Sequence, residues 1–297
     1  CVARSPHPAG PGAVSAPRGL WSDAWRRLRA NRAAVASLVV LTLLGLLAIA
    51  GPALSRYPPD ELDWAMMGVP PDWASGHWFG TDRLGRDLFV RTLHGARISL
   101  AIALLATAVS LVIGVAWGAV AGYAAGRTDA LMMRLVDVLY ALPGVFFVII
   151  LTVVFDRSPM LLFLAIGAVG WLTMARVVRG QAMGLMRREF VEAAIASGAG
   201  PSRIILRHLV PNLAGTVVVY ATLMIPQMIL VESFLSFLGI GIQEPLASLG
   251  NLIADGAAEM EAAPWILLAP AGCLVVIVFC FNFLGDGLRD ALDPRER

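Results

Sequence analysis

The chain has 297 residues, of which 58% are hydrophobic and only 15% are charged, and its mean hydropathy is +0.74. Soluble domains carry about a quarter charged residues, so this composition indicates a polytopic membrane protein. All 23 basic residues are arginines, which excludes the lysine of a Walker A loop and a lysine Schiff base, and a net charge of +2 gives no reason to expect nucleic acid as a partner.

The first 19 residues are rich in proline, glycine and alanine and show no periodicity, so we expect a disordered lead. The chain begins with Cys1 rather than with methionine, and a trimmed start explains this better than a lipid-modified end. The tail 1–32 carries six arginines against one acid and ends in WRRLRANR. This excess of arginine predicts a cytoplasmic tail.

Six charge-free runs are long enough to cross roughly 30 Å of hydrocarbon as helices. They cover 33–55, 98–126, 138–155, 158–175, 209–231 and 262–285. Only Asp156 and Arg157 separate the third run from the fourth, which predicts a tight helical hairpin. The predicted fold class is an all-α polytopic membrane protein with six transmembrane helices. Its parts are a first helix 33–55, an extracytoplasmic loop 56–97, a core 98–285 and a tail 286–297.

The distribution of arginine also predicts the orientation of the spans. The segment 176–212 has six arginines against two acids and should be cytoplasmic. The segment 240–263 has four acids and no arginine, and 53–96 has six acids against four arginines, so both should lie outside. Six spans agree with these assignments and place both termini in the cytoplasm.

Aromatic residues gather in the predicted outer loop 56–97 as Tyr57, Trp64, Trp73 and Trp78. Tryptophan and tyrosine are enriched where a membrane meets water, so these side chains could anchor the loop at the membrane surface. Exposed aromatic residues are also typical of surfaces that bind a protein partner. The sequence leaves both interpretations open.

Small and kinking residues mark the predicted spans. Gly114, Gly118 and Gly122 recur every four residues, line one face of the second span and predict close packing against another helix rather than a conduction role. Pro143 and Pro226 lack a backbone donor and should kink the third and fifth spans.

Glu232 is the one acid deep in an otherwise apolar run. An ionisable residue inside a membrane is a functional candidate by default, but this one lies near the predicted outer end of its span. There it could equally reach water or bond to a neighbouring helix. Asp137 and Asp286, which flank spans on the inner side, are expected to be ordinary interfacial charges.

No metal-ligand pattern stands out. Cys1, Cys273 and Cys280 lack metal spacing, and the last two are expected to pack as small hydrophobes. His208 has no partner at helical spacing that would make it a metal ligand.

The segment 187–208 combines helical periodicity with several charges. Residues 187–198 are predicted to form a helix that ends at Gly198, followed by a turn and a second helix that leads to Pro211. Lipid cannot bury the charges of this segment, which are Arg187, Arg188, Glu189, Arg203 and Arg207. The segment should therefore dock into a groove of a soluble partner or lie on the inner leaflet with its arginines on lipid phosphates.

Several stretches resemble a known family. Glu192-Ala193-Ala194, then Gly198 and a closing Pro211, resemble the EAA motif of ATP-binding-cassette (ABC) importer permeases. The ending His208-Leu209-Val210-Pro211-Asn212 departs from the generic motif and is similar to the peptide and nickel branch. Other stretches typical of that branch are HWFGTDRLGRDLFVR at 77–91, SFLGIGIQEPLASLG at 236–250 and LGDGLRDALDPR at 284–295. From residue 20 onward the chain is most similar to C-type permease subunits of bacterial oligopeptide importers.

The resemblance implies a type I importer permease fold in the bacterial cytoplasmic membrane, with the first span added to a shared core. It implies that 187–208 is the coupling element that fits a cleft of an ATPase subunit. The residues it places there are Glu192, Ala193, Ala194, Gly198, Arg203, Arg207, His208 and Pro211. The implied partners are a B-type permease, two ATPase subunits that bind ATP and Mg, and an extracytoplasmic peptide-binding protein.

On this interpretation the chain imports peptides, is not an enzyme and holds no cofactor. The same family also admits nickel or another small solute as cargo. A secondary transporter usually has paired charges within several spans, and these spans are nearly free of charge. A membrane enzyme would need its reactive residues grouped, and the four histidines are scattered.

Overall fold

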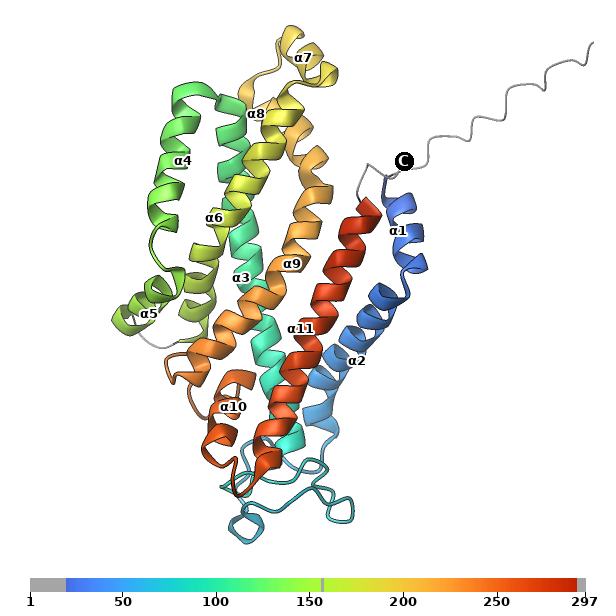
Figure 1. The fold of residues 1–297 in the computed structure, drawn as a ribbon, viewed down its shortest axis with the longest axis vertical. Coiled ribbons are helices and arrows are strands. Elements are labelled where there is room, and N and C mark those ends of the chain that lie inside the picture. The colour runs from blue at the N-terminus through green and yellow to red at the C-terminus, as the bar shows by residue number, and fades with distance from the viewer. Residues whose placement is uncertain (1–19, 156–157, 293–297) are drawn as a thin grey trace, which may run out of the picture.

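The structure, a computed structural model, describes residues 20–155 and 158–292 (Figure 1). The expected disordered lead and the expected turn at Asp156 and Arg157 lie outside the described residues. The helical elements, in chain order, are α1 (Leu20–Ala30), α2 (Arg32–Leu54), a 3-10 turn (Trp64–Met66), α3 (Leu88–Ala124), α4 (Gly126–Tyr140), α5 (Gly144–Phe155), α6 (Pro159–Met186), α7 (Glu189–Ala196), α8 (Pro201–Ile204), a π-helical turn (Ile205–Leu209), α9 (Val210–Phe237), α10 (Leu249–Ala258) and α11 (Pro264–Leu292).

Five of these helices are long and apolar enough to cross a membrane, namely α2, α3, α6, α9 (with α8) and α11. Helices α4 and α5 meet the same test together but are bent by 77° at the break between them. The expected third span, 138–155, is therefore wrong as a single helix. The first residues of this expected span form the end of α4. Pro143 lies in the break before α5, because proline disfavours helical backbone at the residue that precedes it.

Helix α3 begins at Leu88, so residues 88–97, which the sequence assigned to the outer loop, are helical. The carboxylate of Asp87 caps this end by accepting a hydrogen bond from the backbone N–H of Val90 at 2.9 Å. Arg91 continues the helix although it is buried, because Asp82 and Glu244 lie within 4 Å of its guanidinium. The loop and the segment before α10 thus supply one countercharge each, which lets the helix extend beyond its apolar part.

The two ends of the bundle carry different elements (Figure 1). Helices α7 and α8 lie at one end, where α1 also packs against the last turns of α11 through Ala24, Leu28 and Ala291. The loop 55–87 and α10 lie at the opposite end. Helix α1, in the tail from which no element was expected, is separated from α2 by Asn31, whose side chain caps α2.

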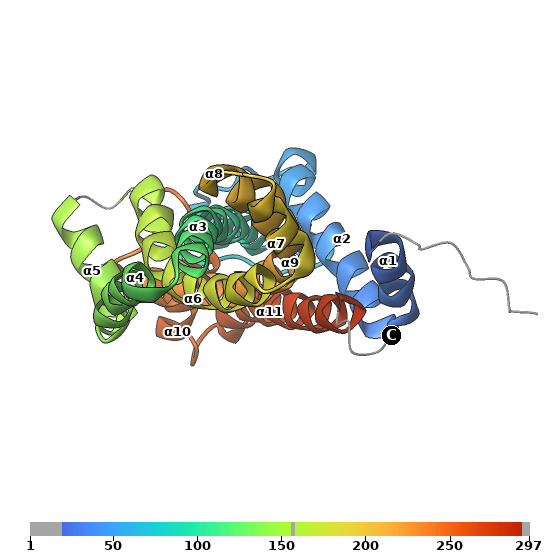
Figure 2. The same cartoon turned by 90° about the horizontal axis from the view of Figure 1, so that it is seen from above.

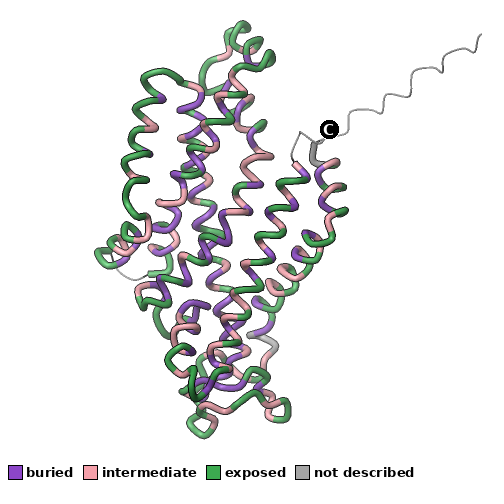
Figure 3. The backbone as a smooth tube through the Cα atoms, viewed as in Figure 1, coloured by how far each residue is buried: buried purple, intermediate pink, exposed green. Residues whose placement is uncertain are grey.

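The centre of the bundle is the parallel packing of α3 on α6, with α9 beside both (Figure 2). Gly114, Gly118 and Gly122 of α3 all face α6, where a Cβ on Gly118 would lie 2.5 Å from the carbonyl oxygen of Ala175. Buried residues follow α3, α6 and α9, whereas α4 and α5 are largely exposed (Figure 3).

Helices α9 and α11 complete the core. Helix α9 runs through Pro226 without a break in the helix. Cys273 and Cys280 of α11 are free thiols, and Cys280 is buried. Asp286 is exposed on the last part of α11.

Candidate functional site

The candidate coupling segment, residues 187–208, projects from one end of the bundle and reverses direction at Gly198 (Figure 1). The backbone N–H of Gly198 donates to the carbonyl oxygen of Ile195 at 2.9 Å, and that of Ala199 donates to Ala194 at 3.1 Å. These two bonds form a Schellman motif, which requires left-handed backbone at its turn. Gly198 has φ +81°, and a Cβ there would meet no atom within 4 Å. The backbone conformation, not lack of space, therefore requires glycine.

The outer surface of this segment mixes apolar and charged side chains. Phe190, Ile195 and Leu206 are exposed large hydrophobic residues, and Leu206 is 69% exposed. Among the residues of the expected coupling site, exposed positions include Glu192, Ala193, Arg203, Arg207 and Pro211, while Ala194 is half-buried. Beneath this surface Val191, Ile204 and Leu209 are buried and fix the segment to the bundle.

The second half of the segment is continuous with α9 rather than a separate helix. Residues 205–209 form a π-helical turn in which the N–H of Val210 donates to the carbonyl oxygen of Ile205. Pro211 has no N–H and its ring crowds the carbonyl of the preceding turn, so a wider turn accommodates it. His208 is half-buried in this turn, and its ring lies 6.4 Å from that of Phe190. Motion of the segment is therefore mechanically joined to α9.

At the opposite end, a buried ionic network holds the loop 55–87 against the segment before α10. Arg86 donates from Nε to Asp82 at 2.6 Å and from Nη1 to Glu244 at 3.0 Å. Burial disfavours the charged guanidinium, but the two carboxylates outweigh it and raise the pKa of Arg86. Burial also raises the pKa of the Asp255 carboxyl, which pairs with Arg83 at 3.8 Å. These ion pairs join the loop to the segment before α10 and to α10 itself.

The aromatic residues of the loop fall into two groups. Tyr57 stacks on His77 with ring centroids 4.3 Å apart and so stabilises the loop. Trp64 and Trp73 are 66% and 81% exposed. Trp78 packs edge-on against Phe89 at the start of α3, about 13 Å beyond Ile98, where the charge-free part of that helix begins. A surface for a protein partner and an anchor at the membrane surface both stay predictions for these residues.

Glu232 lies in a cage of serine hydroxyls inside the bundle. It is fully buried, and Ser236 Oγ donates to its carboxylate at 2.8 Å. Ser233 Oγ lies at 3.3 Å, and Ser99 of α3 and Ser248 before α10 lie beside the carboxylate, with Ser99 Oγ accepting a hydrogen bond from the backbone N–H of Leu249 at 3.2 Å. The carboxylate is thus shielded from water and packs where α3, α9 and α10 meet, while a functional role for Glu232 stays a prediction.

The sequence did not identify two ion pairs that join α4 to α6. Arg179 donates from Nη2 to Asp129 at 2.6 Å, and Arg176 donates from Nη2 to Asp137 at 2.7 Å. Asp137 was expected to be an ordinary interfacial charge, and Arg176 was counted only toward the cytoplasmic segment. The packing of α4 against α6 brings these pairs together, and no spacing in the sequence shows this.

Comparison with known proteins covers nearly the whole chain. Residues 114–297 match the family described as binding-protein-dependent transport system inner membrane component. Residues 19–71 match the N-terminal transmembrane domain of oligopeptide transport permease C.

Several curated relatives are similar along almost their full length. The oligopeptide transport system permease protein OppC of Escherichia coli K12 is 56% identical over 280 residues, which are 94% of this chain and 93% of the relative. OppC of Bacillus subtilis 168 is 45% identical over 278 residues, 94% and 90% of the two chains. The dipeptide transport system permease protein DppC of the same organism is 45% identical over 276 residues, 93% and 86% of the two chains. The chain therefore belongs to the family of multi-pass inner-membrane components of binding-protein-dependent transport systems, with the type I ABC importer permease fold.

Proposed function

We propose that this chain is the transmembrane subunit of an ATP-driven importer that moves peptides across the bacterial cytoplasmic membrane. Relatives named as oligopeptide and dipeptide permeases align with more than nine-tenths of the chain, which supports peptides as the cargo. The coupling segment is the observation that carries the ATP-driven mechanism. It presents apolar and arginine side chains at a bundle end, where lipid cannot cover them.

The coupling segment docks into a groove of an ATPase subunit. Phe190, Ile195 and Leu206 supply apolar anchors, and Arg203 and Arg207 supply charges for the rim, a combination typical of protein interfaces. This chain contains no lysine and hence no Walker A loop. ATP and Mg therefore bind to two partner ATPase subunits, and this chain is not catalytic.

Two further partners complete the importer. A related B-type permease pairs with this chain in the membrane. An extracytoplasmic peptide-binding protein docks on the loop 55–87, where Trp64, Trp73 and Trp78 are exposed. Both termini and the coupling segment then lie in the cytoplasm, in agreement with their excess of arginine.

The mechanism is a switch between two accessible states of the permease pair. ATP closes the ATPase dimer and moves the docked segment as a rigid body. Because the segment is continuous with α9 through residues 205–209, this motion reaches the membrane core. ATP and the loaded receptor act by binding one of the two states more tightly.

Reconstitution of the purified complex tests this function. This chain, tagged and expressed with its neighbouring subunits, should co-purify with ATPase subunits. In proteoliposomes with the receptor, it should accumulate labelled peptide only when ATP is supplied. Accumulation of nickel or another small solute instead of peptide would show that this solute, and not peptide, is the cargo. Flux through the isolated chain, driven by an ion gradient without ATPase subunits, would establish a secondary transporter instead.

A further inference from the structure

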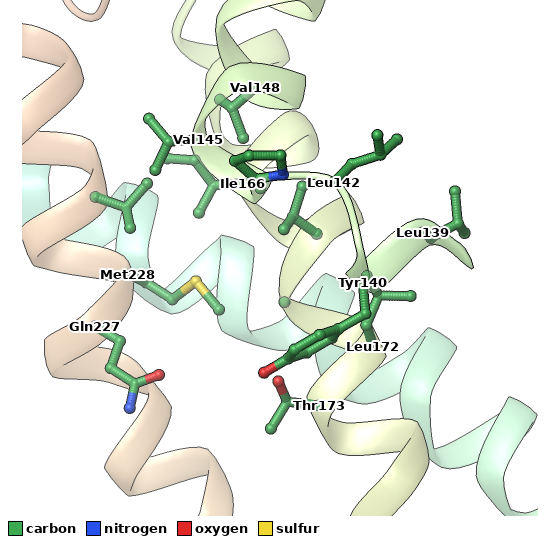
Figure 4. Close-up of a pocket in the computed structure, with 15 residues that line it drawn as sticks. Leu139, Tyr140, Leu142, Val145, Val148, Ile166, Leu172, Thr173, Gln227 and Met228 are labelled. Atoms are coloured by element: carbon green, nitrogen blue, oxygen red, sulfur yellow. The ribbon is translucent and has the colours of Figure 1, made fainter. Parts of the chain in front are cut away.

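A cavity of about 400 Å³ lies at the break between α4 and α5, where these helices meet α6 and α9 (Figure 4). Most of its lining is apolar, with Leu142 and Met228 among the side chains. Three polar side chains interrupt this lining. Tyr140 and Thr173 point their hydroxyls toward one another, and Gln227 extends from α9 opposite them (Figure 4). All three are exposed in this chain.

An ion pair extends this polar area. Arg176, one turn along α6 from Thr173, donates to Asp137 at 2.7 Å and stacks over the Tyr140 ring at 4.1 Å. Unlike the Arg86–Asp82 pair, whose side chains are both 7% exposed, this pair is open: the Arg176 and Asp137 side chains are 39% and 63% exposed. Polar groups from α4, α6 and α9 thus share one uncovered face.

The packing of α3 on α6 sets the depth of this face. The charge-free stretch 98–126 of α3 is centred near residue 112. Gly114 lies against Met174, and Gly118 lies against Ala175, so Thr173 and Arg176 lie within about 10 Å of that centre at 1.5 Å per residue. Met228, next to Gln227, contacts Gly170 of the same region of α6. The polar face is therefore inside the hydrocarbon layer, which extends about 15 Å to either side of its centre.

Lipid is a poor occupant for such a face. An arginine or aspartate at the centre of a membrane costs about 3 kcal/mol on insertion scales and is found facing a protein interior or a water-filled cavity. In the described part of this chain, the side chains of Arg176 and Asp137 remain exposed. The occupant must offer polar groups at mid-membrane depth.

We propose that Tyr140, Thr173 and Gln227 line the translocation path and hydrogen-bond to the backbone of the passing peptide, an inference that rests on the peptide-import function proposed above. A peptide that leaves water keeps one N–H donor and one C=O acceptor at nearly every residue, and each needs a partner. Hydroxyl and amide side chains both donate and accept. These three side chains are neutral and the rest of the lining is apolar. They can therefore bond to the backbone of any peptide without selecting its side chains.

Accessibility of single cysteines tests the lining. In a background with Cys1, Cys273 and Cys280 replaced by alanine, Thr173→Cys and Gln227→Cys are introduced into the assembled importer in membrane vesicles. The probe is a small hydrophilic methanethiosulfonate, which reacts with thiolate and hence only where water reaches the site. Val275→Cys is the matched control, because Val275 is half exposed in the middle of the α11 apolar stretch.

We expect labelling at positions 173 and 227 during ATP turnover, and slower labelling there when peptide and receptor are present. Position 275 should not be labelled. Absence of labelling at 173 and 227 in every state would place these residues in a dry interface with the partner permease and overturn the proposal. Labelling that peptide leaves unchanged, in vesicles whose unmodified importer takes up peptide, would also overturn it. Uptake by the unmodified importer is measured first, so failure of the peptide function itself is recognised separately.

A second variant separates peptide contact from support of the fold. Gln227→Leu removes one hydrogen-bonding partner and should lower peptide uptake about threefold to tenfold, the effect of losing one such bond. Receptor-stimulated ATP hydrolysis should persist, so the number of peptides moved per ATP falls. An unchanged ratio of uptake to hydrolysis would contradict contact between Gln227 and the peptide.

Discussion

Gly118 of α3 and Ala175 of α6 approach so closely that a Cβ on the glycine would lie 2.5 Å from the Ala175 carbonyl oxygen. Real Cβ atoms do not approach an oxygen this closely, so one of the two helices must shift when a side chain is added. This contact lies in the most extensive helix pair of the bundle. Small residues at such an interface allow close helix packing in the absence of a hydrophobic driving force.

Gly118→Ala should therefore destabilise the bundle by about 1–3 kcal/mol, the usual cost of overpacking. Gly180→Ala on α6 is the matched control, because a Cβ there meets no atom within 4 Å and alanine favours helix. Thermal denaturation of the purified chain in detergent should show a lower midpoint for Gly118→Ala only. Equal midpoints for the two variants would mean that the helices are not in close contact at Gly118.

The ionic network at the loop 55–87 predicts an asymmetry between two arginines. Arg86→Ala removes the 2.6 Å partner of the buried Asp82 carboxylate and leaves only Arg91, at 3.6 Å, to offset its charge, which should cost about 3 kcal/mol, the lower end for a broken buried pair. Arg83→Ala breaks only a partly exposed pair at 3.8 Å and should cost less than about 1 kcal/mol. Hydrogen exchange of the loop 55–87 should accelerate strongly in the first variant and little in the second. Similar exchange in both would show that the network does not hold the loop.

The proposed orientation is checked by placing cysteines at the two ends of the bundle. In the cysteine-free background, Ala196→Cys on α7 should react with an impermeant thiol reagent only from the cytoplasmic side. Ala257→Cys on α10 should react only from outside, because α7 and α10 lie at opposite ends of the bundle (Figure 1). Intact and inverted vesicles supply the two sides. Reaction of both positions from one side would contradict the proposed topology.

Charge reversal separates a docked segment from one that lies on lipid. Glu192 is exposed on α7, and Glu192→Lys reverses the charge of a face that we expect to contact the ATPase subunit. Peptide uptake should fall severalfold at equal amounts of complex. A segment resting on anionic lipid would instead gain attraction from the added positive charge and leave uptake intact. Glu61→Lys, an exposed change on the outer loop, controls for the altered net charge.

Much of the fold follows from local signals in the sequence. Charge-free length identifies α2, α3, α6, α9 and α11, and the four-residue glycine period identifies the α3 face that meets α6. Gly198 was also correctly predicted to end α7, because a helix that reverses there needs left-handed backbone.

The features that sequence reasoning missed depend on pairs of residues far apart in the chain. Arg91 remains helical only because Asp82 and Glu244 neutralise it, so an outer limit for α3 drawn at the first charge was wrong. Tyr140 and Gln227 gain their shared cavity only through the 77° bend after α4. Hydropathy does not register such a bend, because both halves of the broken span are apolar.

Two glycines of one turn test whether residues 187–208 couple ATP hydrolysis to transport. Gly198 has φ +81° and Gly200 has φ −71°, and a Cβ at either meets no atom within 4 Å. Alanine therefore costs about 1–2 kcal/mol at 198, where left-handed backbone is required, and little at 200. The two variants add the same methyl group to the same exposed turn.

The measurement is ATP-dependent peptide uptake by membranes that contain equal amounts of each assembled complex. Gly198→Ala should lower the ratio of correctly turned to distorted segment about fivefold or more, as 1–2 kcal/mol produces, and so reduce uptake, while Gly200→Ala stays close to the unmodified importer. Normal uptake by Gly198→Ala, with its complex fully assembled, would contradict the coupling role of this segment.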